Sequence, residues 1–371
     1  MSAIASTFAQ ALPGDRTRSI WGLLGEKPGD NAQIEAVANA TGLPWEKKRI
    51  QVVERWRVAK PAVAADISHI DVAASEGLEP PWPDMIITSG RRLMNAALWI
   101  KQRSPQTKLV LVGRPHGHFD AFDLIVAAPQ FRLPPLPHVV NLDLPLLFPS
   151  RERIARETST WQAEFKTLPR PLTAVLVGAA AIPFCFDRVV ADELAQRSIA
   201  LSQEGSCYFV TSRRTSAEIA DAIAARLRPQ DRLYRWQPEQ PRNPYLALLG
   251  SADRFIVTGD SASMMVEVAR LGKPLAICEL PQDRRLVRWP GLLRQSAEKA
   301  ARTLLGGKTA VAWLRPFGLF KARDLPSLHQ ALYRMGRAVS FPHPFPPAAD
   351  IGADTELVQV GLRVRALLQG A

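Results

Sequence analysis

Short apolar runs alternate with amphipathic stretches along the first half of the chain. The amphipathic stretches have the helical period over Asn31–Thr41 and Arg91–Arg103. The apolar runs predict strands at Ser19–Leu24, Arg49–Val53, Met85–Thr88, Leu109–Gly113, Leu124–Ala127 and Val139–Asn141. Short apolar strands separated by helices are typical of a parallel sheet that helices cover on both faces.

The alternation restarts after a long charged helix, which the pattern predicts from Arg151 to Lys166. The segment Pro169–Pro171 follows, and we expect the hinge between two domains there. The second set of predicted strands is Thr173–Val177, Ser206–Thr211, Leu233–Trp236, Arg254–Thr258 and Leu275–Cys278, with helices at Arg188–Gln203, Ser216–Leu227 and Ala262–Leu271. A last helical pattern covers Thr355–Leu368.

Two such sets predict an α/β protein with two Rossmann-like, doubly wound domains that face a central cleft. We expect the first domain at residues 1–168 and the second at residues 169–350. Residues 351–371 are expected to form a C-terminal helix that packs back across the domains. Ligands of such folds bind beyond the carboxyl ends of the strands, so the loops that follow the strands are the places to look for a site.

The chain has 371 residues, of which 47% are apolar and 22% charged, and this composition suits two folded domains. No apolar run approaches the roughly 18 residues of a membrane-spanning helix, and the first residues lack the apolar centre of a signal peptide. We therefore expect a cytoplasmic protein without a transmembrane segment. Cys185, Cys207 and Cys278 are too far apart for a disulfide framework or a CxxC metal site, and we expect all three to be buried.

The formal net charge of +12 indicates an anionic partner. The basic residues are spread along the chain as Arg-Arg pairs and are not clustered with aromatic residues, so nucleic acid is disfavoured. An anionic membrane surface or a phosphate-bearing ligand fits better. This balance predicts a peripheral location at the inner face of a membrane.

The most informative segment is Arg254–Pro274, which reads as a strand, a sharp turn and a helix. A helix N-terminus has unpaired N–H groups, so a phosphate beside Ser261, Ala262 and Ser263 would be bound by main chain and hydroxyls together. Glu267 lies one helical turn after Ser263, on the same helix face, and suits the hydroxyls of a ribose. The alternative is that Ser261 only caps the helix and that Glu267 is solvated.

A second candidate phosphate loop follows the predicted strand at residues 206–211. Arg213 and Arg214 stand between hydroxyl residues there and could neutralise the charge of a departing phosphate. Gly178 follows the first strand of the same domain and allows a third close approach of the backbone. The alternative is that Thr215 or Ser216 caps the next helix and that the arginines are surface charges.

In the first domain, the loop after the first strand contains Gly29, Asp30 and Asn31. Asp30 is the candidate general base, because a carboxylate beside a cleft can take a proton from an acceptor hydroxyl. The alternative is that Asp30 caps a helix that begins at Asn31, and the two roles are compatible.

A further loop of the first domain contains Ser89, Gly90 and Arg91, again at the carboxyl end of a strand, where all three could line the same cleft. The alternative for the arginine is an exposed side chain. His116, His118 and Asp120 have a spacing that a metal tolerates, but a single loop without a fourth ligand is a poor site, and we expect no metal.

Five segments in this order resemble the mitochondrial-fission ELM1-like family: Gly25–Gln33, Trp82–Arg92, Gly113–Pro115, Thr211–Thr215 and Thr258–Glu267. That family is related in fold to the nucleotide-sugar glycosyltransferases with two Rossmann-like domains, the GT-B type. The resemblance implies that Glu267 holds the ribose and that the preceding turn holds the diphosphate. The chain departs from related enzymes at Gly178–Ala181, where a Gly-Gly pair is common, and this departure weakens the case for a phosphate at that loop.

The residues and the resemblance together predict a glycosyltransferase that moves a sugar from a nucleoside-diphosphate sugar to an acceptor hydroxyl without a metal or another cofactor. The second domain would bind the nucleotide sugar and the first the acceptor, whose identity is open and which we expect to be a lipid-linked glycolipid or cell-envelope precursor. One alternative is a nucleotide-sugar epimerase. The other is a non-catalytic, membrane-associated scaffold that keeps the fold and recruits partners through its basic surface.

Overall fold

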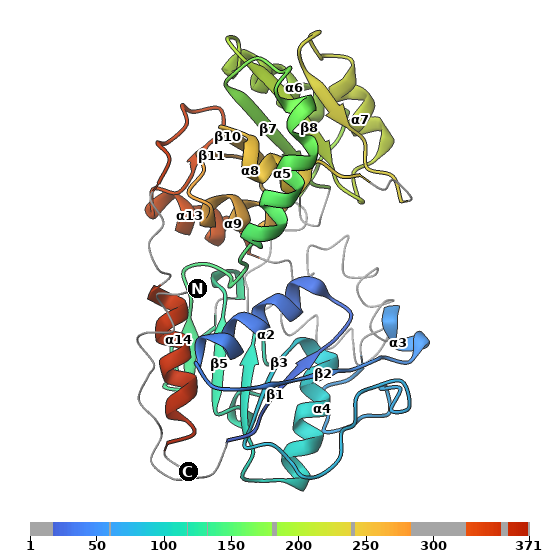
Figure 1. The fold of residues 1–371 in the computed structure, drawn as a ribbon, viewed down its shortest axis with the longest axis vertical. Coiled ribbons are helices and arrows are strands. Elements are labelled where there is room, and N and C mark those ends of the chain that lie inside the picture. Colours follow the sequence, from blue (N-terminus) through green and yellow to red (C-terminus); the bar gives the residue numbers. More distant parts are fainter. Residues whose placement is uncertain are drawn as a thin grey trace. The chain divides into compact units, whose positions relative to one another are not determined.

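The computed structural model describes residues 18–58, 61–116, 118–131, 133–179, 184–238, 242–282, 324–349 and 355–369 (Figure 1). The chain divides into two compact units, Met1–Phe148 with Ile351–Ala371, and Pro149–Asp350. Within the described residues each unit contains a six-stranded parallel sheet. The predicted fold class of two doubly wound α/β domains is therefore confirmed.

The sheet of the first unit has the strand order β2-β1-β3-β4-β5-β6. The strands are β1 (Ile20–Leu24), β2 (Glu46–Arg49), β3 (Met85–Ser89), β4 (Lys108–Val112), β5 (Leu124–Ala127) and β6 (Val139–Asn141). The helices are α2 (Pro28–Ala40), α3 (Glu54–Val58), α4 (Gly90–Arg103) and α14 (Thr355–Ala366), with 3₁₀ turns η2 (Phe119–Ala121) and η3 (Pro129–Phe131).

The edge strand β2 corrects one expectation. The apolar run Arg49–Val53 predicted the strand, but β2 begins at Glu46 and ends at Arg49, so most of that run lies beyond it. Ile50 and Val52 are buried after the strand has ended, whereas β2 itself is mainly polar and exposed. The residues that are buried here are therefore not the residues that pair in the sheet. A hydrophobic pattern predicts burial and does not reveal this difference.

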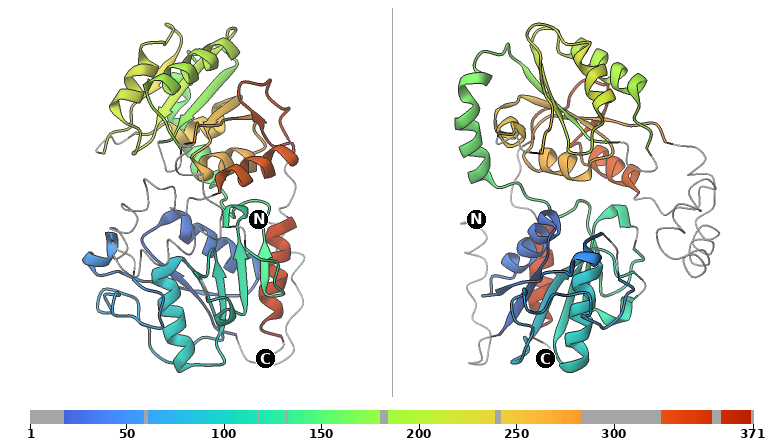
Figure 2. Two further views of the ribbon diagram at one scale, coloured as in Figure 1. Left: turned by 180° about the vertical axis from the view of Figure 1, so that it is seen from behind. Right: turned by 90° about the vertical axis from the view of Figure 1, so that its right-hand side faces the viewer.

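Helices cover both faces of the first sheet, α2 and α14 on one side and α4 on the other (Figure 2). The C-terminal helix α14 buries Val360 and Val364 and packs against α2. Gly361 permits this packing, because a Cβ there would overlap the Ala40 carbonyl. The last helix of the chain thus completes the core of the first unit.

The second sheet has the order β12-β11-β10-β7-β8-β9. Its strands are β7 (Leu172–Val177), β8 (Ser206–Thr211), β9 (Arg232–Tyr234), β10 (Arg254–Thr258), β11 (Leu275–Cys278) and β12 (Val339–Ser340). Its helices are α5 (Arg151–Phe165), α6 (Arg188–Leu201), α7 (Ala217–Ala224), α8 (Tyr245–Ser251), α9 (Ala262–Arg270) and α13 (Leu325–Arg334). Because strand order reverses at β7 and β10, right-handed crossovers place α6 and α7 on one face and α9 and α13 on the other.

The boundary between the units lies before α5, not after it. The expected boundary followed residue 168, but the structure divides the chain between Phe148 and Pro149. Helix α5 packs on α8, with the Thr158 hydroxyl 3.5 Å from the Ala247 carbonyl, and the Phe165 ring meets a core tyrosine of β8 edge-on. These contacts make α5 part of the second core, and the prolines after it are not a hinge.

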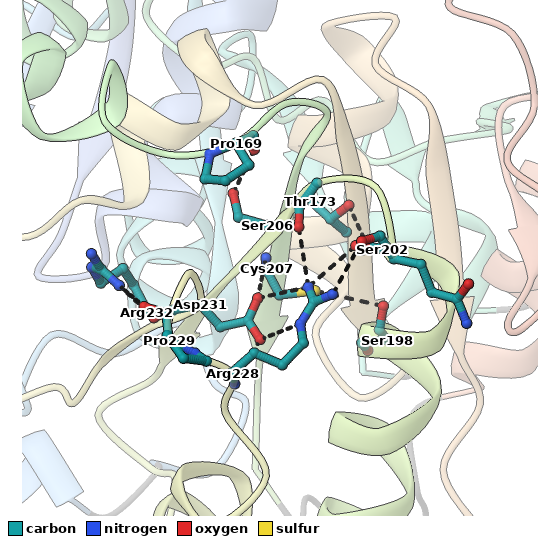
Figure 3. Close-up of polar contacts among 12 residues, drawn as sticks. Pro169, Thr173, Ser198, Ser202, Ser206, Cys207, Arg228, Pro229, Asp231 and Arg232 are labelled. Carbon is teal, nitrogen blue, oxygen red and sulfur yellow. Dashed lines mark hydrogen bonds and ion pairs between the residues drawn. The ribbon is translucent and has the colours of Figure 1, made fainter.

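A closed polar network ties the amino end of β8 to its neighbours (Figure 3). The Asp231 side chain is fully buried and accepts the Cys207 N–H at 2.8 Å and two bonds from the Arg228 guanidinium at 2.9 Å. The same guanidinium donates to the carbonyls of Ser202 and Gly205 at 3.2 Å, just beyond the end of α6. Burial opposes ionisation of Asp231, but the Arg228 guanidinium and the main-chain N–H groups of Cys207 and Arg228 outweigh it and lower the pKa of this carboxyl.

Two of the three cysteines are buried as expected, and one is not. Cys207 and Cys278 lie in strands β8 and β11, and burial raises the pKa of their thiols to about 11 and about 12. Cys185 is exposed, which corrects the expectation drawn from its apolar neighbours. Cys185 lies in the loop between β7 and α6, where apolar neighbours in the sequence do not determine whether a side chain is buried.

Removing the Asp231 carboxylate by Asp231→Ala should cost about 3 kcal/mol of unfolding free energy at neutral pH, since it leaves a partly buried guanidinium unpaired. The folded pKa of Asp231 is lowered, so its contribution is present above the unfolded pKa and disappears as pH falls through the folded value. Urea unfolding at several pH values measures this difference. Asp192→Ala, which breaks the exposed pair with Arg226, is the control and should have a smaller effect; equal losses in both variants would contradict the interpretation.

Candidate functional site

Three loops of the second unit meet at the carboxyl ends of β7, β8 and β10. Strands β7 and β10 are neighbours in the sheet although they are far apart in the sequence, which makes this the point where strand order reverses. The Gly178 N–H donates to the Thr258 hydroxyl at 2.8 Å, which joins the loop after β7 to the carboxyl end of β10. The Gly178 carbonyl accepts the Thr215 hydroxyl at 2.6 Å, which adds the loop after β8.

Gly178 has to be a glycine for this junction to close. A Cβ at position 178 would overlap both carboxylate oxygens of Asp260 and would lie 2.7 Å from its Cγ. The Asp260 carboxylate therefore lies directly over the backbone of Gly178, and its Oδ2 accepts the Ala179 N–H at 2.7 Å. The predicted close approach at Gly178 is made by an acidic side chain of the protein itself.

Asp260 is the feature of the site that the sequence prediction missed. Its side chain is buried, with 6% of the residue exposed, and in the described part of the chain Oδ1 has no hydrogen-bond partner. Burial raises the pKa of this carboxyl, while the Ala179 N–H, the Thr258 hydroxyl and the charge of Arg214 favour the ionised form less strongly. An acidic residue immediately before two serines and a helix is the signal from which it could have been found.

The turn before α9 is bonded to helix α13. The buried His329 of α13 donates from Nε2 to the Gly259 carbonyl at 2.8 Å. Ser261 occupies the N-cap position of α9, but among the described residues its hydroxyl makes no capping bond. Ser263 is exposed in the first turn. The structural alternative expected a capping bond from Ser261, and within the described residues its side chain does not make one.

In the loop after β8, the hydroxyl residues make hydrogen bonds within the fold and the two arginines are exposed. Ser216 caps α7 by accepting the Ile219 N–H, as the structural alternative predicted. Thr215 instead joins the junction at Gly178. Arg213 and Arg214 are both exposed, and the charge of Arg214 reaches Asp260. The structure thus brings one of the two predicted arginines toward the α9 turn.

The Glu267 side chain is not freely solvated, and one of its carboxylate oxygens already accepts a hydrogen bond within the protein. It lies on α9 opposite α8, and the Tyr245 hydroxyl donates to its Oε2. Burial raises the pKa of the Glu267 carboxyl, and burial together with this carboxylate raises the pKa of Tyr245 well above the ordinary value. Glu267, which was predicted to bind the ribose, therefore already has one carboxylate oxygen bonded to a tyrosine 22 residues earlier in the chain.

In the first unit, the strand order reverses between β1 and β3. Asn31 closes the loop after β1, since its side chain bonds the Gly25 N–H at 2.9 Å and the Gly25 carbonyl at 2.7 Å. Asp30 lies in the first turn of α2, which begins at Pro28 with Lys27 at the N-cap position, so Asp30 is not the cap. The helix begins three residues earlier than predicted, and the Asp30 carboxylate pairs with Lys27 at 3.6 Å.

The two predicted loops of the first unit lie side by side. Asp30 Oδ2 is 3.4 Å from the place a Cβ of Gly90 would occupy, and the positive φ of 75° at Gly90 is a conformation that favours glycine. Ser89, the residue before α4, is buried. Arg91 is part-buried and contacts the His116 ring, with 3.2 Å between Nη2 and Nδ1, so it does not extend into solvent. Gly29 is exposed on the same loop as Asp30.

Two negative observations apply only to the residues that the structure describes. Within them, no three His, Cys, Asp or Glu side chains are grouped closely enough to hold a metal ion, and His116, His118 and Asp120 form no such group. None of the helices in the described segments has the length and hydropathy needed to cross a bilayer.

Comparison with known proteins identifies the family. The family model "Mitochondrial fission ELM1" matches residues 28–314, which is most of the chain. The chain belongs to the mitochondrial fission ELM1 family. This ELM1-family chain is 27% identical over 237 residues to the mitochondrial fission protein ELM1 of Arabidopsis thaliana, and the match covers 57% of the chain but only 55% of the plant protein. The chain thus spans little more than half of that relative.

Several solved structures resemble this chain in fold only. A UDP-GlcNAc 2-epimerase from Methanocaldococcus jannaschii matches with a TM-score of 0.47 and 11% identity, covering 95% of this chain and 100% of that one. MurG from Acinetobacter baumannii matches with a TM-score of 0.43 and 12% identity, covering 95% and 92%. At these identities and TM-scores the likenesses bear on neither activity nor ligand.

The Gly178→Ala substitution tests the junction at the α9 turn. The added methyl must displace the Asp260 carboxylate, so we expect a loss of about 1–3 kcal/mol in unfolding free energy, measured by urea denaturation. Gly29→Ala is the matched control, because none of the described atoms lies within 4 Å of a Cβ at that position. If Gly178→Ala were as stable as Gly29→Ala, the close contact with Asp260 would be incorrect.

Proposed function

We propose that this protein transfers a sugar from a nucleoside-diphosphate sugar to an acceptor hydroxyl, with the donor bound by the second unit. The observation that carries the proposal is the convergence of three loops at Gly178 and at the turn before α9, where the strand order of the second sheet reverses. Sites of this kind bind nucleotides because the main-chain N–H groups and the helix dipole favour phosphate.

The donor is proposed to lie with its diphosphate on the N–H groups of α9 and on the hydroxyls of Ser261 and Ser263. Arg213 and Arg214 supply cationic charge from the neighbouring loop, so the proposed reaction uses no metal ion. Glu267 is proposed to accept hydrogen bonds from the ribose hydroxyls through Oε1, while Tyr245 holds Oε2. The tyrosine would then fix the direction of the carboxylate.

Asp30 is proposed as the general base of the first unit. The acceptor oxygen forms a bond to the anomeric carbon of the sugar, its proton passes to Asp30, and the bond from that carbon to the diphosphate oxygen breaks. The nucleoside diphosphate leaves with the electron pair of that bond. The net charge of +12 supports an acceptor at an anionic membrane surface, such as a glycolipid or cell-envelope precursor.

A non-catalytic scaffold is the second candidate. The observation in its favour is the bond from Tyr245 to Glu267, because a carboxylate engaged within the protein also serves a purely structural purpose. The scaffold would keep the α9 turn as part of the fold and bind partners through basic residues on its surface.

Donor binding predicts selective stabilisation by one nucleotide among UDP, GDP, ADP, CDP, dTDP and CMP. At about 100 times Kd, the matching nucleotide should raise the melting temperature by about 5 °C or more. Glu267→Ala should abolish this shift, because it removes the ribose contact. Glu218→Ala, on the exposed first turn of α7, is the matched control and should retain it. Absence of a shift with every nucleotide would favour the scaffold.

General-base catalysis predicts a separation of binding from turnover. Asp30→Asn should keep the nucleotide-induced stabilisation but slow transfer of labelled sugar into a membrane-lipid extract by about 10²- to 10⁴-fold. Glu35→Gln, a similar change on the same helix, should leave the rate unchanged. Transfer at the wild-type rate by Asp30→Asn would remove Asp30 from the mechanism, and interconversion of the donor sugar without transfer would indicate an epimerase.

A further inference from the structure

A buried carboxyl group lies beside the position proposed for the diphosphate of the donor. Asp260 immediately precedes the N-cap residue of α9, and its carboxylate covers the backbone of Gly178. Its Oδ2 is used by the Ala179 N–H, whereas Oδ1 is buried without a hydrogen-bond partner among the described residues. A buried polar atom left unpaired costs about 1–3 kcal/mol, so its position calls for a partner that binds there.

An ionised Asp260 and a bound diphosphate would repel each other. Two negative charges within about 4–6 Å disfavour each other's ionised form, and the effect grows where water is excluded. A proton on Oδ1 removes this conflict and turns the unpaired acceptor into an O–H donor, while Oδ2 still accepts the Ala179 N–H. Building on the proposed function, we propose that Asp260 takes up a proton when the diphosphate binds and donates a hydrogen bond from Oδ1 to a phosphate oxygen.

The groups that face Asp260 are compatible with this step. From the loop after β8, Arg214 supplies a positive charge, and from β10 the Thr258 hydroxyl favours the ionised form, but burial outweighs both and raises the pKa of Asp260. On β11, burial raises the pKa of Cys278 to about 12, so this thiol is neutral. On α13, burial lowers the pKa of His329, which is therefore uncharged at neutral pH.

Glu267 is the competing proton acceptor in the same unit. It is also an acid whose pKa is raised by burial, but it accepts a hydrogen bond from Tyr245 and lies more than one helical turn from the start of α9. Asp260 directly precedes the N-cap residue of α9, whose N–H groups are proposed to bind the diphosphate. A test must therefore separate these two carboxyls.

Proton uptake makes donor affinity depend on pH. Between the pKa of Asp260 in the free protein and its higher value in the complex, affinity should fall by up to about tenfold per pH unit as pH rises. Asp260→Asn imitates the protonated acid, because its amide oxygen accepts the Ala179 N–H and its NH₂ group donates to the phosphate. This variant should bind with an affinity that depends little on pH.

The experiment is isothermal titration calorimetry of the full-length protein. The probe is the nucleotide sugar whose parent nucleotide gives the largest thermal shift, since its diester phosphates do not titrate near neutrality. Titrations at several pH values, in buffers of different ionisation enthalpy, count the protons taken up. Asp253→Asn, at the amino end of β10, is the matched control and should take up protons as the wild type does.

We expect uptake of up to one proton by the wild type and by Asp253→Asn, and none by Asp260→Asn. Equal uptake in Asp260→Asn overturns the inference and leaves the proposed function standing. If no nucleotide sugar binds the wild type, the proposed function fails and this inference fails with it. Should Asp260→Asn not fold, Glu267→Gln replaces it, because its amide keeps an oxygen for the ribose hydroxyls. Binding with proton uptake in Glu267→Gln supports Asp260, and binding without proton uptake assigns the proton to Glu267 and overturns the inference.

Discussion

The carboxyl edge of the second sheet depends on the contact between Gly178 and Asp260. Only a residue without a Cβ lets the carboxylate lie over the backbone after β7, and that carboxylate in turn holds the next N–H. The neighbouring loops are fastened to the same point, by the Thr215 hydroxyl on the Gly178 carbonyl and by His329 on the Gly259 carbonyl. The direction in which α9 starts follows from these bonds.

The two edges of this sheet use buried charge in opposite ways. At the amino edge, Asp231 is paired with a guanidinium and main-chain N–H groups, and Arg228 also reaches nearby carbonyls. A network satisfied in this way stabilises the fold and has no capacity left for a ligand. At the carboxyl edge, Asp260 keeps one buried oxygen without a partner in the described part of the chain.

The sequence was a good guide to the elements whose side chains are buried on both faces. Strands β5, β8, β10 and β11 have the predicted bounds, because the middle of a central parallel strand is apolar. The edge strand β6 also has its predicted bounds. The exposed strand β2 was misplaced. Short elements such as α8 and β12 were not predicted, because so few residues do not show a clear hydrophobic period. The boundary between the units was also misplaced, since the partner that α5 packs on lies more than eighty residues later.

The predicted site residues show the same division. Loops after strands could be found from glycine and hydroxyl residues, and the loops that contain Gly178 and Thr215 do meet. Their partners could not be found, because Tyr245 on Glu267, His329 on Gly259 and Asp260 on Ala179 are contacts between separate elements. Such pairing depends on the closed fold and leaves no local pattern.

Membership of the ELM1 family does not choose between an enzyme and a scaffold, because a fold is compatible with both. The chemistry of the α9 turn is more informative. A scaffold needs the turn only as a connection between β10 and α9, and for that purpose an asparagine at position 260 could bond the Ala179 N–H without burying an ionisable group. A carboxyl with one oxygen unpaired is a costly way to build a connection. It is a direct way to build a donor whose strength depends on protonation, and this difference favours a ligand-binding role for the second unit.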